Sequence, residues 1–203
     1  MSAYPVMLDG NAIRALIVGG GPVAVRKARG LVDAGATVRV VAKDVCAELA
    51  ALAAVCPAVS VSQKPYEQAD IDGATLVFAA TDDAALNQAV GEAARARGLP
   101  VNVADAPERG TFVTPAVHRS GDIVVAVTAG GVPTAARRIR DAIAPAIDGR
   151  YASAIASLAA LRRALLTSGR RERWREAAGA LTGPDFSARI ESGSFAEQVA
   201  RWR

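Results

Sequence analysis

The stretch from Leu16 to Ala24 constrains the fold of this chain more than any other part of the sequence. An apolar run ends there in a glycine turn and a helix start, made by Gly19, Gly20, Gly21, Pro22, Val23 and Ala24. Counted from the first glycine, the spacing is G-x-G-x-x-A, in which the glycines allow a tight turn and close approach of a pyrophosphate to the backbone. Proline suits a first helical turn, whose free N–H groups attract anions. The pattern therefore predicts a phosphate-binding loop.

The flanking residues supply the context that this loop requires. Val25, Ala28 and Val32 recur at helical spacing until Gly35, and Thr37–Ala42 follows as an apolar strand. A plain tight turn between a strand and a helix is the alternative interpretation. The complete strand–helix–strand unit favours a nucleotide site.

The end of the second strand leaves the choice between NAD and NADP open. An acidic residue about 20 positions after the glycines usually binds the ribose hydroxyls. Here the segment continues as Lys43 and Asp44. Either Asp44 is a displaced ribose ligand, or Lys43 meets a 2′-phosphate.

Polar residues follow two further predicted strands, Leu76–Ala80 and Val101–Ala104. Thr81 and Asp82 come after the first and Asp105 after the second, so we expect them at the carboxyl edge of a parallel sheet, where open α/β folds bind ligands. Asp105 is our candidate general base. The alternatives are that Asp82 only caps the helix that follows, which we expect to end at Arg97, and that Asp105 only starts a turn.

The strand and helix alternation changes after Asp105. We expect short strands at Thr111–Thr114 and Ile123–Thr128, then a second glycine turn and a helix to about Ile147. This helix entry could hold an anionic substrate through Thr128, Gly130, Gly131, Arg137 and Arg138, or could be a plain helix entry. The expected fold class is α/β: a Rossmann-like parallel-sheet domain (1–112), a small β-containing segment (113–149) and a C-terminal helical domain (150–203).

The cationic residues point to a polyanionic ligand. The net charge is +4, and all but three of the 24 basic residues are arginines, with clusters at 137–140 and 170–175. Arginine makes bidentate contacts with carboxylates and phosphates, although arginine-rich codon usage is an alternative explanation. An aromatic content of 4% and the lack of a recognition motif argue against nucleic acid.

The sequence also bears on where the protein is located and on whether it binds a metal. No apolar run approaches the roughly 18 residues of a membrane span, and Met1–Asp9 lacks the pattern of a signal peptide, so we expect a cytoplasmic protein. Cys46 and Cys56 are expected to be reduced thiols. His118 is the single histidine, and we favour a surface or interface position over a proton or metal role. We expect no protein metal site.

Several ordered motifs together resemble one family. They are Gly19–Ala24 with Arg26–Ala28, Ala79–Asp83 with Leu86–Asn87, Asn102–Pro107, Phe112–Val117, Gly130–Gly131 and the stretch Arg170–Trp174. These motifs closely resemble the precorrin-2 dehydrogenase/sirohydrochlorin ferrochelatase family, which forms the N-terminal part of siroheme synthase.

This resemblance implies an NAD-dependent oxidation of precorrin-2 to sirohydrochlorin, followed in some members by insertion of Fe²⁺. It also implies a homodimer built through the segment after the nucleotide domain, and a catalytic role for Asp105. A tetrapyrrole with many carboxylates suits an arginine-rich protein. The family often has serine where Ala129 stands, and Thr128 is the nearest hydroxyl here.

A second class of function stays open at this point. A non-catalytic regulatory module could sense NAD(H) through Gly19–Ala24 and contact another macromolecule through its arginine-rich helices. Thr81 and Asp105 favour the enzyme, because a sensor needs no proton acceptor beside the nicotinamide.

Overall fold

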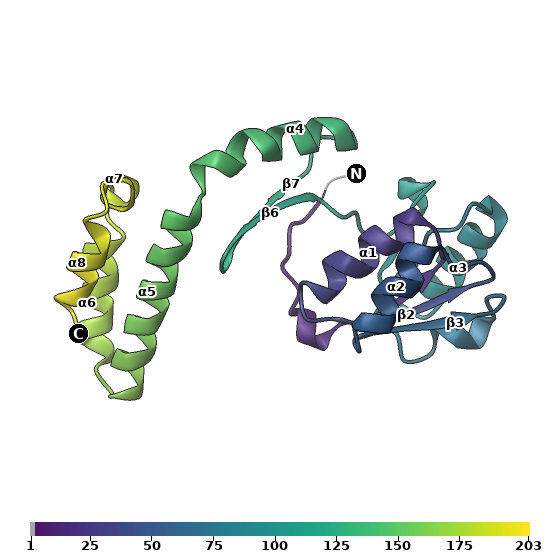
Figure 1. The fold of residues 1–203 in the computed structure, drawn as a ribbon, viewed down its shortest axis with the longest axis horizontal. Helices are drawn as coiled ribbons and strands as arrows, with labels where there is room; N and C mark the ends of the chain where they lie inside the picture. Colours follow the sequence, from purple (N-terminus) through teal and green to yellow (C-terminus); the bar gives the residue numbers. More distant parts are fainter. Residues whose placement is uncertain (1–2) are drawn as a thin grey trace. The chain divides into compact units, whose positions relative to one another are not determined.

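The computed structural model describes residues 3–203 and divides into two compact units, Met1–Thr114 and Pro115–Arg203 (Figure 1). The second unit contains both the β-containing segment and the helices that we expected to form separate parts. Our division at residues 112 and 149 stays a prediction.

The first unit is a five-stranded parallel sheet with the strand order β3-β2-β1-β4-β5. Its strands are β1 (Arg14–Val18), β2 (Thr37–Ala42), β3 (Val59–Gln63), β4 (Leu76–Ala79) and β5 (Val101–Val103). The connections are α1 (Pro22–Val32), α2 (Ala47–Val55) and α3 (Ala84–Ala96), with 3-10 turns η1 (Gly10–Ala12), η2 (Gln68–Ile71) and η3 (Pro107–Arg109). The strand order reverses between β1 and β4, which is where such sheets bind ligands. The Rossmann-like fold class is confirmed.

Apolar residues cover both faces of this sheet, as expected for buried parallel strands. One core cluster joins α1 and α2 to Ile17, Val40 and Phe78, and the other joins α3 to Leu16 and Val77. The strands are apolar at nearly every position because successive side chains point to opposite faces of the sheet, and both faces are buried.

The second unit begins with an antiparallel hairpin and continues in helices. The hairpin is β6 (Ala116–Ser120) and β7 (Ile123–Val127). The helices are α4 (Pro133–Ile143), the 3-10 turn η4 (Ala144–Ala146), α5 (Gly149–Thr167), α6 (Arg171–Leu181), α7 (Phe186–Glu191) and α8 (Phe195–Ala200). Leu158, Leu161 and Leu165 on α5 pack with residues of α6, α7 and α8. These apolar positions, three and four residues apart, make one helix face.

Two local predictions were wrong, and one alternative interpretation is excluded. Thr111–Thr114 is not a strand. The side chain of Thr111 accepts the Val101 N–H (2.8 Å), and the Val101 carbonyl accepts the N–H groups of both Thr111 and Phe112. The segment therefore does not form a regular ladder of hydrogen bonds along β5. The cap of α3 is Asp83 and not Asp82, since its Oδ1 accepts the N–H groups of Ala85 and Leu86. The helix α4 ends at Ile143 instead of about Ile147, because Pro145 has no N–H to continue it.

Lys27 is a half-buried cation inside the first unit. Its Nζ donates to Thr114 Oγ1 at 2.7 Å and lies 5.3 Å from the centroid of the Phe78 ring. Burial, with repulsion from Arg26, lowers the pKa of Lys27 from 10.5 to about 8. Between these two values the unfolded chain holds a proton that the folded chain releases. Lys27 therefore makes the free energy of unfolding rise with pH in this window.

We expect Lys27→Met to raise the free energy of unfolding at pH 7 by about 1–3 kcal/mol, because methionine keeps the stem and removes the buried charge. The rise in stability above pH 8 should then disappear. Urea unfolding at pH 7 and pH 10 measures both effects. Lys64→Met is the control, since it removes a lysine paired with Glu67 and Asp70 and should bring no gain. A Lys27→Met protein less stable than the parent at pH 7 would mean that the ammonium stabilises the fold.

Candidate functional site

The glycine loop lies between β1 and α1, at the carboxyl end of the central strand. Gly19 has a φ of +125°, and a Cβ there would lie 2.2 Å from the Ala80 carbonyl oxygen. A Cβ on Gly20 would lie 2.0 Å from the Asp44 carbonyl oxygen. The loop is therefore pressed against the turns that follow β4 and β2, and only glycine fits at these two positions.

Gly21 differs from its two neighbours because it faces open space. A Cβ at this position would meet nothing within 4 Å. Gly21 is also the N-cap residue of α1, and Pro22 takes the first position of the helix. The N–H groups of Val23 and Ala24 belong to a first helical turn, where no intrahelical acceptor exists. Open space in front of free N–H groups fits a phosphate.

The end of β2 brings Lys43 and Asp44 to the same edge. Both side chains are exposed, and the Gln63 side chain donates to the Lys43 carbonyl oxygen at 3.1 Å. The Asp44 backbone contacts the glycine loop, as the Gly20 geometry requires. The backbone at Asp44, next to Lys43, thus lies beside the loop.

Thr81 and Asp105 are joined by Asn87, a residue of α3 that is only 1% exposed. Asn87 Oδ1 accepts from the backbone N–H and the hydroxyl of Thr81, at 3.0 and 2.8 Å. Its Nδ2 donates to the Thr81 carbonyl at 2.9 Å and to Asp105 Oδ1 at 2.9 Å. The predicted residues that follow β4 and β5 are therefore brought together, whereas Asp82 is exposed in the same turn and takes no part in this network.

Sequence reasoning assigned no role to Asn87. A helix-interior asparagine is unfavourable for the helix and needs hydrogen-bond partners when it is buried. An asparagine on the inner face of a predicted helix could have indicated a buried hydrogen-bonding role. Its partners could not be predicted, because they depend on how α3 packs against β4 and β5.

The second group of predicted residues lies in the second unit, around the entry to α4. Gly130 and Gly131 have φ values of +54° and +81°, and the Val132 N–H donates to the Ala129 carbonyl at 2.8 Å. The side chains of Thr128, Arg137 and Arg138 are exposed. Among residues 3–203, neither of these two arginines has an ion-pair partner. They are accessible to an anionic ligand.

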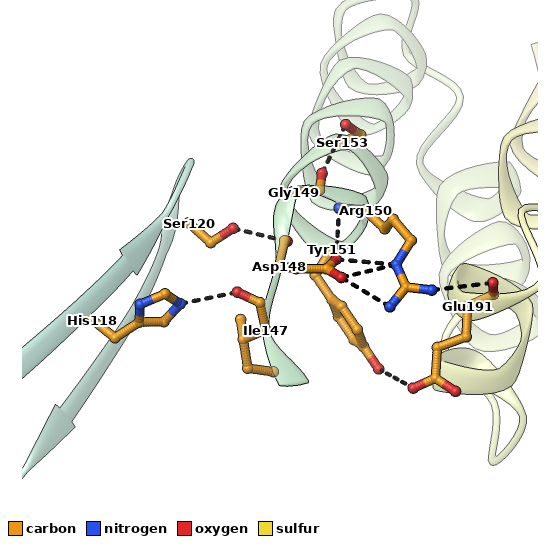
Figure 2. Close-up of polar contacts among 9 residues, drawn as sticks. All are labelled: His118, Ser120, Ile147, Asp148, Gly149, Arg150, Tyr151, Ser153 and Glu191. Atoms are coloured by element: carbon orange, nitrogen blue, oxygen red, sulfur yellow. Dashed lines mark hydrogen bonds and ion pairs between the residues drawn. The ribbon is translucent and has the colours of Figure 1, made fainter. Parts of the chain in front are cut away.

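His118 joins the hairpin to the start of α5 (Figure 2). Its Nε2 lies 2.9 Å from the Ile147 carbonyl oxygen, and Ser120 Oγ donates to the Asp148 carbonyl at 2.8 Å. Asp148 caps α5 through the Arg150 N–H, and its bond to the Arg150 guanidinium lowers the pKa of the carboxyl group. The half-buried His118 thus holds the backbone just before α5, through its contact with the Ile147 carbonyl.

Other chemical features are few in the described part of the chain. Cys46 and Cys56 are both free thiols, and the Cys46 N–H donates to the Gly20 carbonyl at 2.9 Å. Residues 3–203 contain no group of three or more histidine, cysteine, aspartate or glutamate side chains able to hold a metal ion. Over the same residues, no helix has the length and apolar character needed to cross a membrane.

Comparisons with known proteins agree with this geometry. A family model described as "Putative NAD(P)-binding" matches residues 6–116. The siroheme synthase of Pseudomonas entomophila is 49% identical over 148 residues, which are 72% of this chain and 32% of that protein. The siroheme synthase of Nitrosomonas eutropha is 42% identical over 157 residues, which are 75% of this chain and 33% of that protein. The chain spans about a third of the length of these curated relatives.

A solved structure extends the likeness to the whole chain. The protein titled "SirC, precorrin-2 dehydrogenase" matches with a TM-score of 0.73 and 25% identity, covering 98% of this chain and 100% of that chain. The match includes both the sheet unit and the hairpin and helices that follow it.

Proposed function

The chain belongs to this NAD(P)-binding family, and on that premise we propose that it is a precorrin-2 dehydrogenase that uses NAD⁺ to make sirohydrochlorin in siroheme biosynthesis. The observation that carries the proposal is the likeness to SirC, which extends over nearly all of both chains. The identity to parts of two siroheme synthases supports the same reaction.

The residues of the sheet edge fit a dinucleotide. The open space at Gly21 and the free N–H groups of the first turn of α1 suit the pyrophosphate. We propose that Lys43 and Asp44 contact the adenosine ribose and that Thr81 and Asp82 contact the nicotinamide half. When bound, the nicotinamide ring supplies the hydride acceptor of the reaction. We propose NAD over NADP from the family resemblance, and the affinities for NAD⁺ and NADP⁺ measured by calorimetry test this choice.

Asp105 is the proposed proton acceptor. Conversion of precorrin-2 to sirohydrochlorin removes two electrons and two protons, of which one proton leaves with the electrons as hydride. The second proton passes to the Asp105 carboxylate. Because Oδ1 accepts the Asn87 amide, Oδ2 is the oxygen that we assign to proton transfer. We propose that Thr128, Gly130 and Gly131 contact the macrocycle, and that Arg137 and Arg138 bind its carboxylates.

Insertion of Fe²⁺ into sirohydrochlorin is a second proposed activity of the same site. The metal is a substrate here, and the nitrogens of the macrocycle hold it. The protein has to orient the ring and accept the two pyrrole protons, for which Asp105 is again the candidate, taking one proton at a time and passing it to water. Incubating the protein with sirohydrochlorin and Fe²⁺ and following siroheme formation tests this activity.

We expect the protein to be a homodimer assembled mainly through residues after about 112. The hairpin strands β6 and β7 are only partly covered, and Val132 and Ile139 are 51% and 44% exposed. Exposed apolar side chains of this kind favour a partner surface. Sedimentation velocity at micromolar concentration should give the mass of a dimer. A monomer under these conditions would contradict the proposed homodimer.

The catalytic test of the proposal is an anaerobic incubation of the protein with precorrin-2 and either NAD⁺ or NADP⁺. The expected result is formation of sirohydrochlorin and NADH in equal amounts. A protein that binds NAD(H) but does not turn over would favour the regulatory module.

A further inference from the structure

The side-chain amide of Asn87 is held by hydrogen bonds at both its oxygen and its nitrogen. An amide oxygen accepts two hydrogen bonds and an amide nitrogen donates two. Asn87 Oδ1 accepts the backbone N–H of Thr81, and Nδ2 gives one bond to the Thr81 carbonyl and one to Asp105. The Thr81 hydroxyl has one proton, and both Asn87 Oδ1 and the Asp83 carbonyl lie within its reach. The backbone N–H of Thr81 can only donate, so the atom facing it is the oxygen. This fixes the orientation of the whole amide and makes the group facing Asp105 a donor.

The position of Asn87 in the fold explains what this bond connects. Thr81 follows β4 and Asp105 follows β5, and these strands are hydrogen-bonded neighbours. Asn87 lies on α3, the helix that connects them. Asn87 is 1% exposed whereas Asp105 is exposed. A buried group therefore anchors one oxygen of an exposed carboxylate, and the other oxygen accepts no hydrogen bond from residues 3–203.

The chemistry of the anchor matters as much as its geometry. A cationic partner would stabilise the carboxylate strongly and weaken it as a base. A neutral amide fixes the orientation of the carboxylate with a weaker electrostatic effect. Asparagine therefore suits a carboxylate that has to be held still and yet accept a proton.

We infer that Asn87 is a positioning residue, which holds the Asp105 carboxylate in the orientation for proton transfer and fixes it relative to the Thr81 turn. The inference rests on the proposed function, since it takes Asp105 as the group that acts on the substrate. With 1% of its surface exposed, Asn87 is too buried to contact substrate or cofactor itself.

The first test is Asn87→Asp, which keeps the shape of the side chain and replaces its two donors by an oxygen. We expect kcat to fall by about 10- to 100-fold, as for loss of orientation of a general base, with the KM for both substrates within about threefold. Gln88→Glu is the matched control, because it makes the same change from amide to carboxylate at the next, exposed position of α3. It should keep the parental kcat. An Asn87→Asp enzyme with parental kcat would overturn the inference.

A double variant separates positioning from a general effect on folding. In an Asp105→Asn background, Asn87→Asp should change kcat by less than about twofold, because the effect of the asparagine acts through the missing carboxylate. If the two losses multiply, Asn87 acts independently of Asp105 and the inference is wrong.

A spectroscopic measurement needs no turnover. In nitrogen-15 spectra of the free protein, the side-chain amide resonances of Asn87 should differ between the parent and Asp105→Asn, because Nδ2 donates to a carboxylate in the parent and to an amide oxygen in the variant. Identical Asn87 amide resonances in the two proteins would overturn the inference. If the parent protein fails to oxidise precorrin-2 while this difference is present, the proposed function fails and the contact of Asn87 with Asp105 stands.

Discussion

Asp105→Asn should lower the rate of precorrin-2 oxidation by about 10²–10⁴-fold, the usual cost of removing a general base. The asparagine keeps the shape of the side chain, and its amide oxygen can still accept the bond that Asn87 donates to Asp105 Oδ1 in the parent (2.9 Å). Only the proton-accepting oxygen is lost. Steady-state assays with saturating NAD⁺ measure the effect on kcat.

The affinity for NAD⁺ distinguishes a chemical defect from a structural one. Asp105→Asn should leave it within about threefold of the parent, because a base acts in the chemical step. Glu108→Gln, three positions further on in η3, is the control, since it neutralises another exposed carboxylate of this region. Near-parental oxidation by Asp105→Asn would withdraw the catalytic assignment. A parallel fall in Fe²⁺ insertion would mean that both reactions use this base.

Gly21→Asp should abolish nucleotide binding, with the affinity for NAD⁺ reduced by more than about 100-fold, since a side chain and a negative charge would occupy the pyrophosphate space. The fold should survive, because a Cβ at this position meets nothing within 4 Å. Calorimetric titration with NAD⁺ and a thermal unfolding scan measure the two effects. Equal affinities of parent and variant would mean that the loop is only a turn.

Two other glycines provide controls for this substitution. Gly30→Ala lies in the same helix and also faces open space, so binding should stay unchanged while stability rises by about 0.5–1 kcal/mol. Gly20→Ala should instead destabilise the fold, since its Cβ would lie 2.0 Å from the Asp44 carbonyl oxygen. The contrast separates a glycine needed for packing from one proposed to leave room for a ligand.

Much of the sheet unit could be predicted because its signals are local in the sequence. The strand predicted at Thr37–Ala42 has the same limits in the structure, since an apolar run bounded by glycine and charged residues suits a buried parallel strand. The resemblance to siroheme synthase, based on several ordered motifs, is also confirmed.

The predictions that failed depend on hydrogen-bond partners distant in the sequence or on a choice between neighbours. Thr111–Thr114 has the composition of a strand, but the Thr111 side chain occupies the N–H of Val101 that a strand would have paired. The two adjacent aspartates before α3 are equally good caps by composition, and only the backbone geometry selects Asp83. The contact of Asn87 with Asp105 spans 18 residues and requires the packing of α3 on the sheet.

The central claim is that this chain transfers a hydride from precorrin-2 to NAD⁺ at the edge of its parallel sheet. A single-turnover reaction under anaerobic conditions, with precorrin-2 deuterated at the carbon that is oxidised, tests it most directly. The account predicts one equivalent of deuterated NADH for each sirohydrochlorin formed, and no transfer by Gly21→Asp. Sirohydrochlorin formed without deuterium in the nicotinamide, or bound NAD⁺ that is never reduced, would contradict it.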